Sequence, residues 1–129
     1  MKRPTVSVMM PVFNAEAYLA EAVESVLTPT FVDFEFLIID DGSTDRSKSI
    51  LQDYAERDSR IRLTNQANTG YVVALSRMID QAQGTFLARM DADDICHRER
   101  FQRQVAVLET HDNIGAVGSA VQLIDAQSR

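Results

Sequence analysis

Four short apolar segments alternate with four amphipathic segments along this chain, and this alternation is the feature that most constrains its fold. The segment TVSVMMP at residues 5–11 has apolar residues at every second position, which is typical of a strand. The segment FEFLIID at residues 34–40 is almost continuously apolar, like strands buried on both faces of a parallel sheet. Residues 61–65 and 85–90 are the other two expected strands. Strands that alternate with helices predict an α/β protein with a mostly parallel sheet.

Apolar residues with helical spacing follow each expected strand. They are Leu19, Ala22, Val23, Val26 and Leu27 in the first helix, Ile50, Leu51, Tyr54 and Ala55 in the second, Val72, Leu75, Ile79 and Ala82 in the third, and Phe101, Val105 and Leu108 in the fourth. Asn14 is expected to cap the first helix, and Gly84 to close the third. Residues 114–125 are expected to be extended, with breaks at Gly115 and Gly118.

The size and composition of the chain favour one globular domain over residues 1–129, since 45% of its residues are hydrophobic. A net charge of −6 argues against nucleic acid as a partner. The single cysteine, Cys96, excludes an internal disulfide and fits a reducing compartment. The apolar runs are too short to cross a bilayer, and the N-terminus lacks the apolar core of a signal peptide. A cytoplasmic location is therefore expected.

The residues that directly follow the expected strands come from four distant parts of the sequence. They are Phe13-Asn14 after the first strand, Asp40-Asp41 after the second, residues 65–70 after the third, and Asp91, Asp93 and Asp94 after the fourth. Parallel strands joined by right-handed crossovers all end at the same edge of a sheet, where ligands bind in the crevice. The sequence therefore predicts a binding site at this edge.

The crowding of Asp91, Asp93 and Asp94 favours a divalent cation. Hard oxygen ligands without nearby sulfur or paired histidine suit Mg²⁺ or Mn²⁺, which one or two carboxylates commonly hold together with substrate phosphates and water. A cation that joins Asp91 and Asp93 to a diphosphate would offset the repulsion between the carboxylates. The alternative is that these acids only interact favourably with the N-terminus of the following helix.

Two other acidic sites can be tested against the sequence. A calcium-binding EF-hand loop that began at Asp91 would need an oxygen ligand, a glycine and a glutamate where Ile95, Cys96 and Gln102 stand, so that interpretation fails. A phospho-acceptor receiver domain would place its Asp-Asp pair after the first strand and a lysine after the last. Here the pair follows the second strand, and no lysine occurs beyond Lys48.

The segments that carry these residues are similar to those of a known family. VSVMMPVFNAEAYLAEAVESVL, FEFLIIDDGSTD, NTG before a helix, FLARMDADD and ERFQRQV closely resemble the family 2 glycosyltransferases of the GT-A fold, in the same order and over residues 5–125. The resemblance implies a three-layer α/β/α, Rossmann-like nucleotide-binding domain. It also implies transfer of a sugar from a nucleotide diphosphate to an acceptor hydroxyl, with inversion.

The resemblance assigns roles to four residues around the nucleotide. It implies that Pro11 and Phe13 line the nucleobase pocket, with Phe13 stacked on the base. Asp40 would accept a hydrogen bond from the imide N–H of uracil or thymine. Gly70 would let the backbone approach the donor.

The DxD motif of the family corresponds to Asp91-Ala92-Asp93. The resemblance implies that Asp93 is a metal ligand and that Asp91 reaches the metal or the ribose. The expected cofactor is Mn²⁺ or Mg²⁺, which would act as a Lewis acid on the leaving diphosphate.

The general base and the acceptor-binding region of the family are expected beyond Arg129, so the chain resembles the donor-binding part of a longer enzyme. The expected partners are a nucleotide-diphosphate sugar and an acceptor saccharide or another hydroxyl acceptor. Any association with a membrane surface is expected only of the full-length protein. One alternative is a nucleotide-binding module without transfer activity of its own. Another is an α/β interaction domain with an acidic surface.

Overall fold

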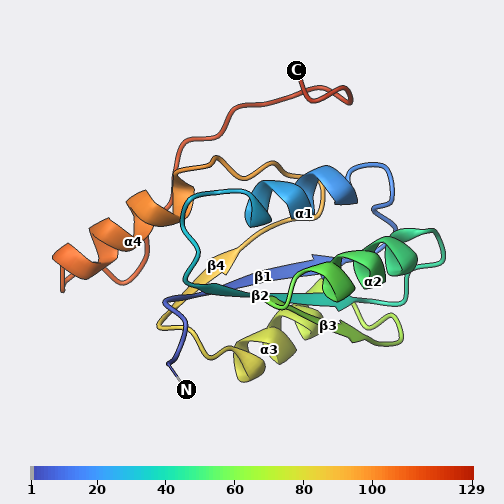
Figure 1. Ribbon diagram of the computed structural model, residues 1–129, viewed down its shortest axis with the longest axis horizontal. Coiled ribbons are helices and arrows are strands. Elements are labelled where there is room, and N and C mark those ends of the chain that lie inside the picture. Colours follow the sequence, from blue (N-terminus) through green and yellow to red (C-terminus); the bar gives the residue numbers. More distant parts are fainter. Residues whose placement is uncertain (1) are drawn as a thin grey trace.

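The computed structural model describes residues 2–129, which form a four-stranded parallel sheet with helices on both faces (Figure 1). The strands are β1 (Val6–Val12), β2 (Phe34–Asp40), β3 (Ile61–Asn65) and β4 (Phe86–Arg89). The helices are α1 (Leu19–Leu27), α2 (Ser47–Arg57), α3 (Tyr71–Gln81) and α4 (Arg100–Thr110). The order β3-β2-β1-β4 places the first two strands in the centre. The α/β class and the parallel sheet predicted from the sequence are confirmed.

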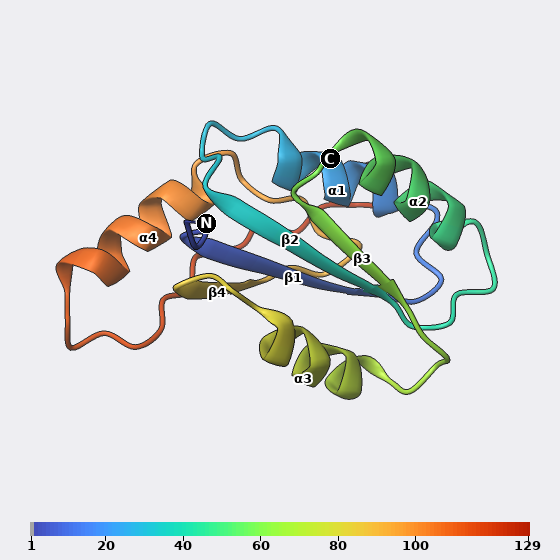
Figure 2. The same cartoon turned by 60° about the horizontal axis from the view of Figure 1, so that its bottom comes forward.

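The helices form two outer layers because both faces of the sheet are apolar. Residues of α1, α2 and α4 pack with Val8, Met10, Phe36 and Ile38 in the larger core. Helix α3 packs on the opposite face against Met9, Leu37 and Ile39 (Figure 2). All seven residues of β2 are buried, which explains why its sequence is almost continuously apolar.

The buried face of α3 matches the prediction only in part, since Leu75 and Ala82 pack against the core as expected but Val72 and Ile79 do not. Val72 and Ile79 are 62% and 51% exposed, whereas Ala74 and Met78 are fully buried. Apolar residues lie mainly on one side of this helix, but that side is broad, so their spacing alone does not determine which part of it faces the sheet. Contacts with the strands below determine it instead.

Gly84 does not close α3, because the helix ends at Gln81 and is followed by Ala82 at the cap position. The glycine is required for a different reason: a side-chain carbon at this position would clash with the backbone nitrogen of Ser7. Gly84 therefore allows the connection between α3 and β4 to pass directly over the start of β1.

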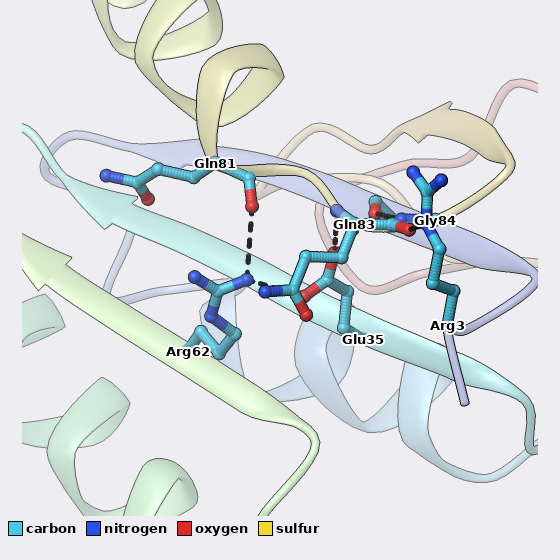
Figure 3. Close-up of polar contacts among 7 residues, drawn as sticks. Arg3, Glu35, Arg62, Gln81, Gln83 and Gly84 are labelled. Atoms are coloured by element: carbon cyan, nitrogen blue, oxygen red, sulfur yellow. Dashed lines mark hydrogen bonds and ion pairs between the residues drawn. The ribbon is translucent and has the colours of Figure 1, made fainter. Parts of the chain in front are cut away.

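A buried polar cluster holds this connection at the N-terminal end of the sheet (Figure 3). Glu35 accepts hydrogen bonds from Ser7 Oγ at 2.5 Å, from the backbone nitrogen of Gln83 at 2.6 Å and from Arg62 Nη1 at 2.7 Å. Arg62 also donates to the carbonyl of Gln81, and the backbone nitrogen of Gly84 donates to Ser7 Oγ. The cluster joins β1, β2 and β3 to the α3–β4 connection.

Residues 112–129 form no helix or strand, so the extended segment predicted at residues 114–125 does not join the sheet. Val121 and Leu123 are 85% and 91% exposed. An extended segment becomes a strand only when another strand satisfies its backbone, and this segment has no such neighbour in the described chain. Near its end, Ser128 Oγ donates to Glu21 Oε2 at 2.6 Å.

Within residues 2–129, no helix combines the length and the apolar character needed to cross a membrane.

Candidate functional site

A cleft of about 360 Å³ lies at the C-terminal ends of β1 and β4. It is lined by Pro11, Phe13, Asn14, Ala15, Tyr18, Tyr71, Arg89, Asp91, Ala92 and Asp93. The structure thus brings together four of the residues predicted for the site, namely Pro11, Phe13, Asp91 and Asp93. Asp40 and Gly70 are not among the residues that line the cleft.

Three aromatic side chains of the cleft are exposed to solvent: Tyr18 is 40% exposed, and Phe13 and Tyr71 are more than half exposed. Phe13 follows β1 and is 52% exposed, and Tyr71, the first residue of α3, is 60% exposed. Large aromatic residues are usually buried in cores or used in binding, because their rings offer extensive contact area. The exposed rings of Phe13 and Tyr71 suit a planar ligand group that enters between the first and third strand–helix connections.

Asn14 is expected from the sequence to cap α1. In the structure it holds the β1–α1 loop instead. Its Oδ1 accepts hydrogen bonds from the backbone nitrogens of Thr44 at 2.8 Å and Asp45 at 3.3 Å, and its own backbone nitrogen donates to Ser43 Oγ. Helix α1 begins five residues later, with Tyr18 at the cap position. Asn14 has a φ of +47°, a left-handed conformation that asparagine tolerates better than most residues.

Further hydrogen bonds join the β1–α1 loop to the start of α2. The backbone nitrogen of Ala15 donates to Ser47 Oγ at 2.9 Å, and that of Glu16 donates to Asp45 Oδ2 at 3.2 Å. In return, the backbone nitrogen of Arg46 donates to Glu16 Oε2 at 3.0 Å. Asp45 and Ser47 therefore fix the loop that presents Phe13.

Asp41 anchors the loop before α3. Its carboxylate accepts hydrogen bonds from Gln66 Nε2 at 2.7 Å, from the backbone nitrogen of Thr69 at 2.9 Å and from the backbone nitrogen of Gly70 at 2.8 Å. Burial works to raise the pKa of Asp41, but these hydrogen bonds outweigh it and lower the pKa below its ordinary value. The carboxylate is therefore charged at neutral pH and holds the segment that leads to Tyr71.

Glycines on either side of this contact adopt left-handed conformations. Gly42 has a φ of +78°, and a side-chain carbon there would lie 2.7 Å from the backbone nitrogen of Asn68. Gly70 has a φ of +90° directly before α3, with open space around it. Gly70 is thus explained by its backbone conformation, and its approach to a donor molecule stays a prediction.

Asp40 is the last residue of β2 and is only 2% exposed. Its Oδ1 has no hydrogen-bond partner among the described residues. Strand alternation places Asp40 on the face of Phe36 and Ile38, which α1 and α2 cover. Because the carboxylate does not line the cleft, its role as an acceptor for a nucleobase also stays a prediction.

The acidic residues after β4 are close enough to affect one another. Burial, together with the charges of Asp91 and Asp93, raises the pKa of Asp94 above its ordinary value, although Arg100 and Arg89 oppose this effect. Asp91 Oδ1 forms an ion pair with Arg89 Nη2 at 3.2 Å. An added cation would further relieve the repulsion among these carboxylates.

The acidic residues suit a cation whose coordination shell is completed by a bound ligand better than a cation held by protein side chains alone. In residues 2–129, no group of three or more histidine, cysteine, aspartate or glutamate side chains is arranged to hold a metal ion. Asp91 and Asp93 nevertheless line the same cleft. Mg²⁺ typically uses one or two carboxylates, with phosphate oxygens and water in the remaining positions, and this donor set matches that pattern.

Sequence reasoning missed Tyr71 and Arg89 as residues of the cleft. The guanidinium of Arg89 lies over the ring of Tyr71, with Cζ 5.8 Å from the ring centre. The only sequence signal for Arg89 is that it is a charged residue in the otherwise apolar segment FLARM; in the structure it is exposed, whereas Ala88 and Met90 are not. Tyr71 had no such signal, because its position depends on how α3 crosses the sheet.

The fold and the cleft together define an α/β protein with a ligand cleft at the carboxyl ends of parallel strands, the usual position in such proteins. The family model for "Glycosyl transferase family 2" matches residues 7–127. The chain belongs to this family, as the resemblance of its motifs indicated.

Curated relatives and solved structures agree with this assignment. The chain is 37% identical over 122 residues to an uncharacterized glycosyltransferase of Haemophilus influenzae, and 41% identical over 100 residues to the uncharacterized glycosyltransferase EpsJ of Bacillus subtilis. These alignments cover 94% and 78% of the chain, but only 38% and 29% of the relatives. The chain thus spans about a third of the length of these two proteins.

Among solved structures, the chain is similar to S. aureus TarS 1–349 in complex with UDP. The TM-score is 0.77 at 27% sequence identity, and the match covers 84% of this chain and 33% of TarS 1–349. The similarity confirms a Rossmann-like nucleotide-binding half of the GT-A type.

Proposed function

We propose that this chain is the donor-binding part of a glycosyltransferase that uses a UDP- or dTDP-sugar. The enzyme transfers the sugar, with inversion, to a hydroxyl group of a saccharide or another acceptor. The observation that carries this proposal is the presence of exposed Phe13 and of Asp91 and Asp93 in one cleft. An aromatic platform and a pair of carboxylates are the groups needed for a base at one end and a metal-bound diphosphate at the other.

The base-binding end is formed by Pro11 and Phe13. Phe13 offers a ring for stacking, and the loop that carries it is fixed by the hydrogen bonds of Asn14. The complex of TarS with UDP supports a uridine nucleotide, since the cleft here lies on the same kind of nucleotide-binding half.

Asp40 supplies the proposed specificity for the base. Its buried, unpartnered Oδ1 would be stabilised by a donor, and uracil and thymine carry an imide N–H that cytosine lacks. Because strand alternation places Asp40 on the other side of β2 from the α3 face, this contact requires the base to reach the edge of the sheet.

The diphosphate end is formed by Asp91 and Asp93, which would hold Mn²⁺ or Mg²⁺ together with the phosphates. When bound, the cation supplies Lewis-acid stabilisation of the charge that develops on the leaving diphosphate. Asp93 is the proposed ligand, and Asp91 reaches either the cation or the ribose. Gly70 lets the backbone come close to the donor.

The acceptor hydroxyl needs a general base within hydrogen-bond reach. Since the carboxylates that line the cleft are assigned to the cation and the nucleotide, we place this base in a part of the enzyme outside residues 1–129. By the same reasoning, this chain alone acts as a nucleotide-binding module and transfers no sugar.

The base assignment can be tested by titrating the protein with UDP, dTDP and CDP in the presence of Mn²⁺. A buried acceptor left unpaired costs about 1–3 kcal/mol, which corresponds to a roughly 5- to 150-fold preference for UDP and dTDP over CDP. Calorimetry of the unmodified chain and of Asp40→Ala measures this preference, which should narrow in the variant.

Asp41→Asn is the matched control for this experiment, because it changes the neighbouring carboxylate. The variant should weaken the hydrogen bonds that hold the loop before α3, but it should retain the preference for UDP over CDP. Equal affinity of the unmodified chain for CDP and UDP would remove the role of Asp40. A preference that disappears in Asp41→Asn alone would transfer that role to Asp41.

A further inference from the structure

Arg89 is the one basic side chain among the residues that line the cleft in the described chain. It is the last residue of β4, where its Cα pairs with that of Met9 in the sheet register. Its backbone carbonyl accepts a hydrogen bond from Arg100 Nη2 at 2.9 Å, which fixes this end of the strand. The position of Arg89 in the cleft is therefore set by the sheet, whereas its side chain is 56% exposed.

Two contacts determine where the guanidinium of Arg89 lies. Nη2 forms the 3.2 Å ion pair with Asp91 Oδ1, and the group lies near the ring of Tyr71. The side chain of Asp91 is itself 47% exposed. Ion pairs with this much exposure are weak because water screens them, so the guanidinium can exchange one anionic partner for another at little cost. The Tyr71 ring remains available to support it after such an exchange.

The charges of the proposed ligand favour this exchange. A nucleoside diphosphate carries more negative charge than one divalent cation neutralises, and a guanidinium binds phosphate oxygens through paired N–H groups. A cation bound at Asp91 would also compete with Arg89 for the same carboxylate. Both effects direct the guanidinium away from Asp91 and toward the diphosphate.

We propose that Arg89 binds the diphosphate of the donor, and that it leaves Asp91 for a phosphate oxygen when a divalent cation binds the acidic residues. This inference rests on the proposed function of the cleft. It adds a protein ligand for the phosphates that the motifs of the sequence did not indicate. It also accounts for the retention of a basic residue beside three carboxylates: Arg89 balances their charge until the cation does so.

The test compares Arg89→Met with the unmodified chain in binding to UDP and to uridine, each with saturating Mn²⁺ and with EDTA. In Mn²⁺, the variant should bind UDP about tenfold more weakly. In EDTA, the loss of UDP affinity should be smaller than in Mn²⁺, since no cation then competes with Arg89 for Asp91. Uridine, which has no phosphate, should bind both proteins equally. Arg89→Lys should show an intermediate loss in Mn²⁺, because it keeps the charge but lacks the paired N–H groups.

Arg57→Met is the matched control, because it removes an exposed positive charge at the end of α2, away from the cleft. It should bind all ligands as the unmodified chain does. Unchanged UDP affinity of Arg89→Met in Mn²⁺ would overturn the proposal, as would an equal loss for uridine. An equal loss of UDP affinity in EDTA and Mn²⁺ would show that no exchange takes place. If the unmodified chain bound neither UDP nor uridine, the proposed function itself would fail.

Discussion

Replacing Asp93 with asparagine should abolish the contribution of Mn²⁺ to UDP binding. Asparagine keeps the size of the side chain but removes the negative charge that a hard cation requires. A cation between protein and diphosphate contributes several kcal/mol, so we expect a loss of UDP affinity on the order of 100-fold. Calorimetric titration with UDP, in Mn²⁺ and in EDTA, measures this loss. The affinity of the variant in Mn²⁺ should fall to the value in EDTA.

The same variant should keep or gain stability in the absence of ligand, because it relieves repulsion among Asp91, Asp93 and Asp94. This expectation separates loss of a ligand from loss of the fold. Asp53→Asn, on the exposed side of α2, is the matched control and should leave the effect of Mn²⁺ intact. If Asp93→Asn bound UDP with undiminished dependence on Mn²⁺, Asp93 would not be a metal ligand.

Replacing Glu35 with alanine should lower the free energy of unfolding more than any other substitution proposed for this chain. The change removes the acceptor for the buried hydroxyl of Ser7 and for the backbone nitrogen of Gln83, an exposed residue whose hydrogen bond to Glu35 is partly buried. A buried donor left without a partner costs about 1–3 kcal/mol, and a partly buried one costs less. The ion pair with Arg62 adds less, since the side chain of Arg62 is 43% exposed. We expect a loss of about 3 kcal/mol in the free energy of unfolding, measured by urea titration.

The contribution of Glu35 should also depend on pH. Burial works to raise the pKa of Glu35, but hydrogen bonds from Ser7, Gln83 and Arg62 outweigh it and lower the pKa below 4.5. A carboxylate with a lowered pKa stabilises the folded state above the pKa of the unfolded chain. This stabilisation is lost as the pH falls through the folded-state pKa. The difference in stability between the unmodified chain and Glu35→Gln should therefore shrink on acidification.

Glu56→Ala is the matched control for Glu35→Ala, because Glu56 is an exposed residue of α2. Its replacement should change the free energy of unfolding by less than about 0.5 kcal/mol. A cost for Glu35→Ala no greater than that for Glu56→Ala would show that the polar cluster does not stabilise the α3–β4 connection.

The order of strands and helices could be predicted because short apolar segments alternate with amphipathic segments along the chain. The apolar run of β2 indicated a central strand, and it is buried along its whole length. The position of the cleft at the carboxyl ends of the strands could be predicted from the topology alone, since all parallel strands end on the same side of the sheet. Phe13, Asp91 and Asp93 were found in this way.

Other features of the site and of the fold depend on contacts between distant segments. The spacing of residues along the chain does not reveal such contacts. Asn14 looked like a helix cap, but its side chain bonds Thr44 and Asp45, some thirty residues away. Tyr71 and Arg89 meet only because α3, which packs against β1 and β2, begins near the end of β4. The buried strip of α3 could not be predicted from its sequence, because the apolar side of the helix is broader than the strip that contacts the sheet.

On the proposed function, a divalent cation and a nucleoside diphosphate bind together in the cleft at Asp91 and Asp93. Paramagnetic broadening of backbone amide signals by Mn²⁺ tests this claim most directly, because it reports where the ion lies. With UDP present, a small amount of Mn²⁺ should broaden the signals of residues 91–94 and spare those around Glu35, at the opposite end of the sheet. Broadening that is centred elsewhere, or that does not change when UDP is added, would contradict the claim.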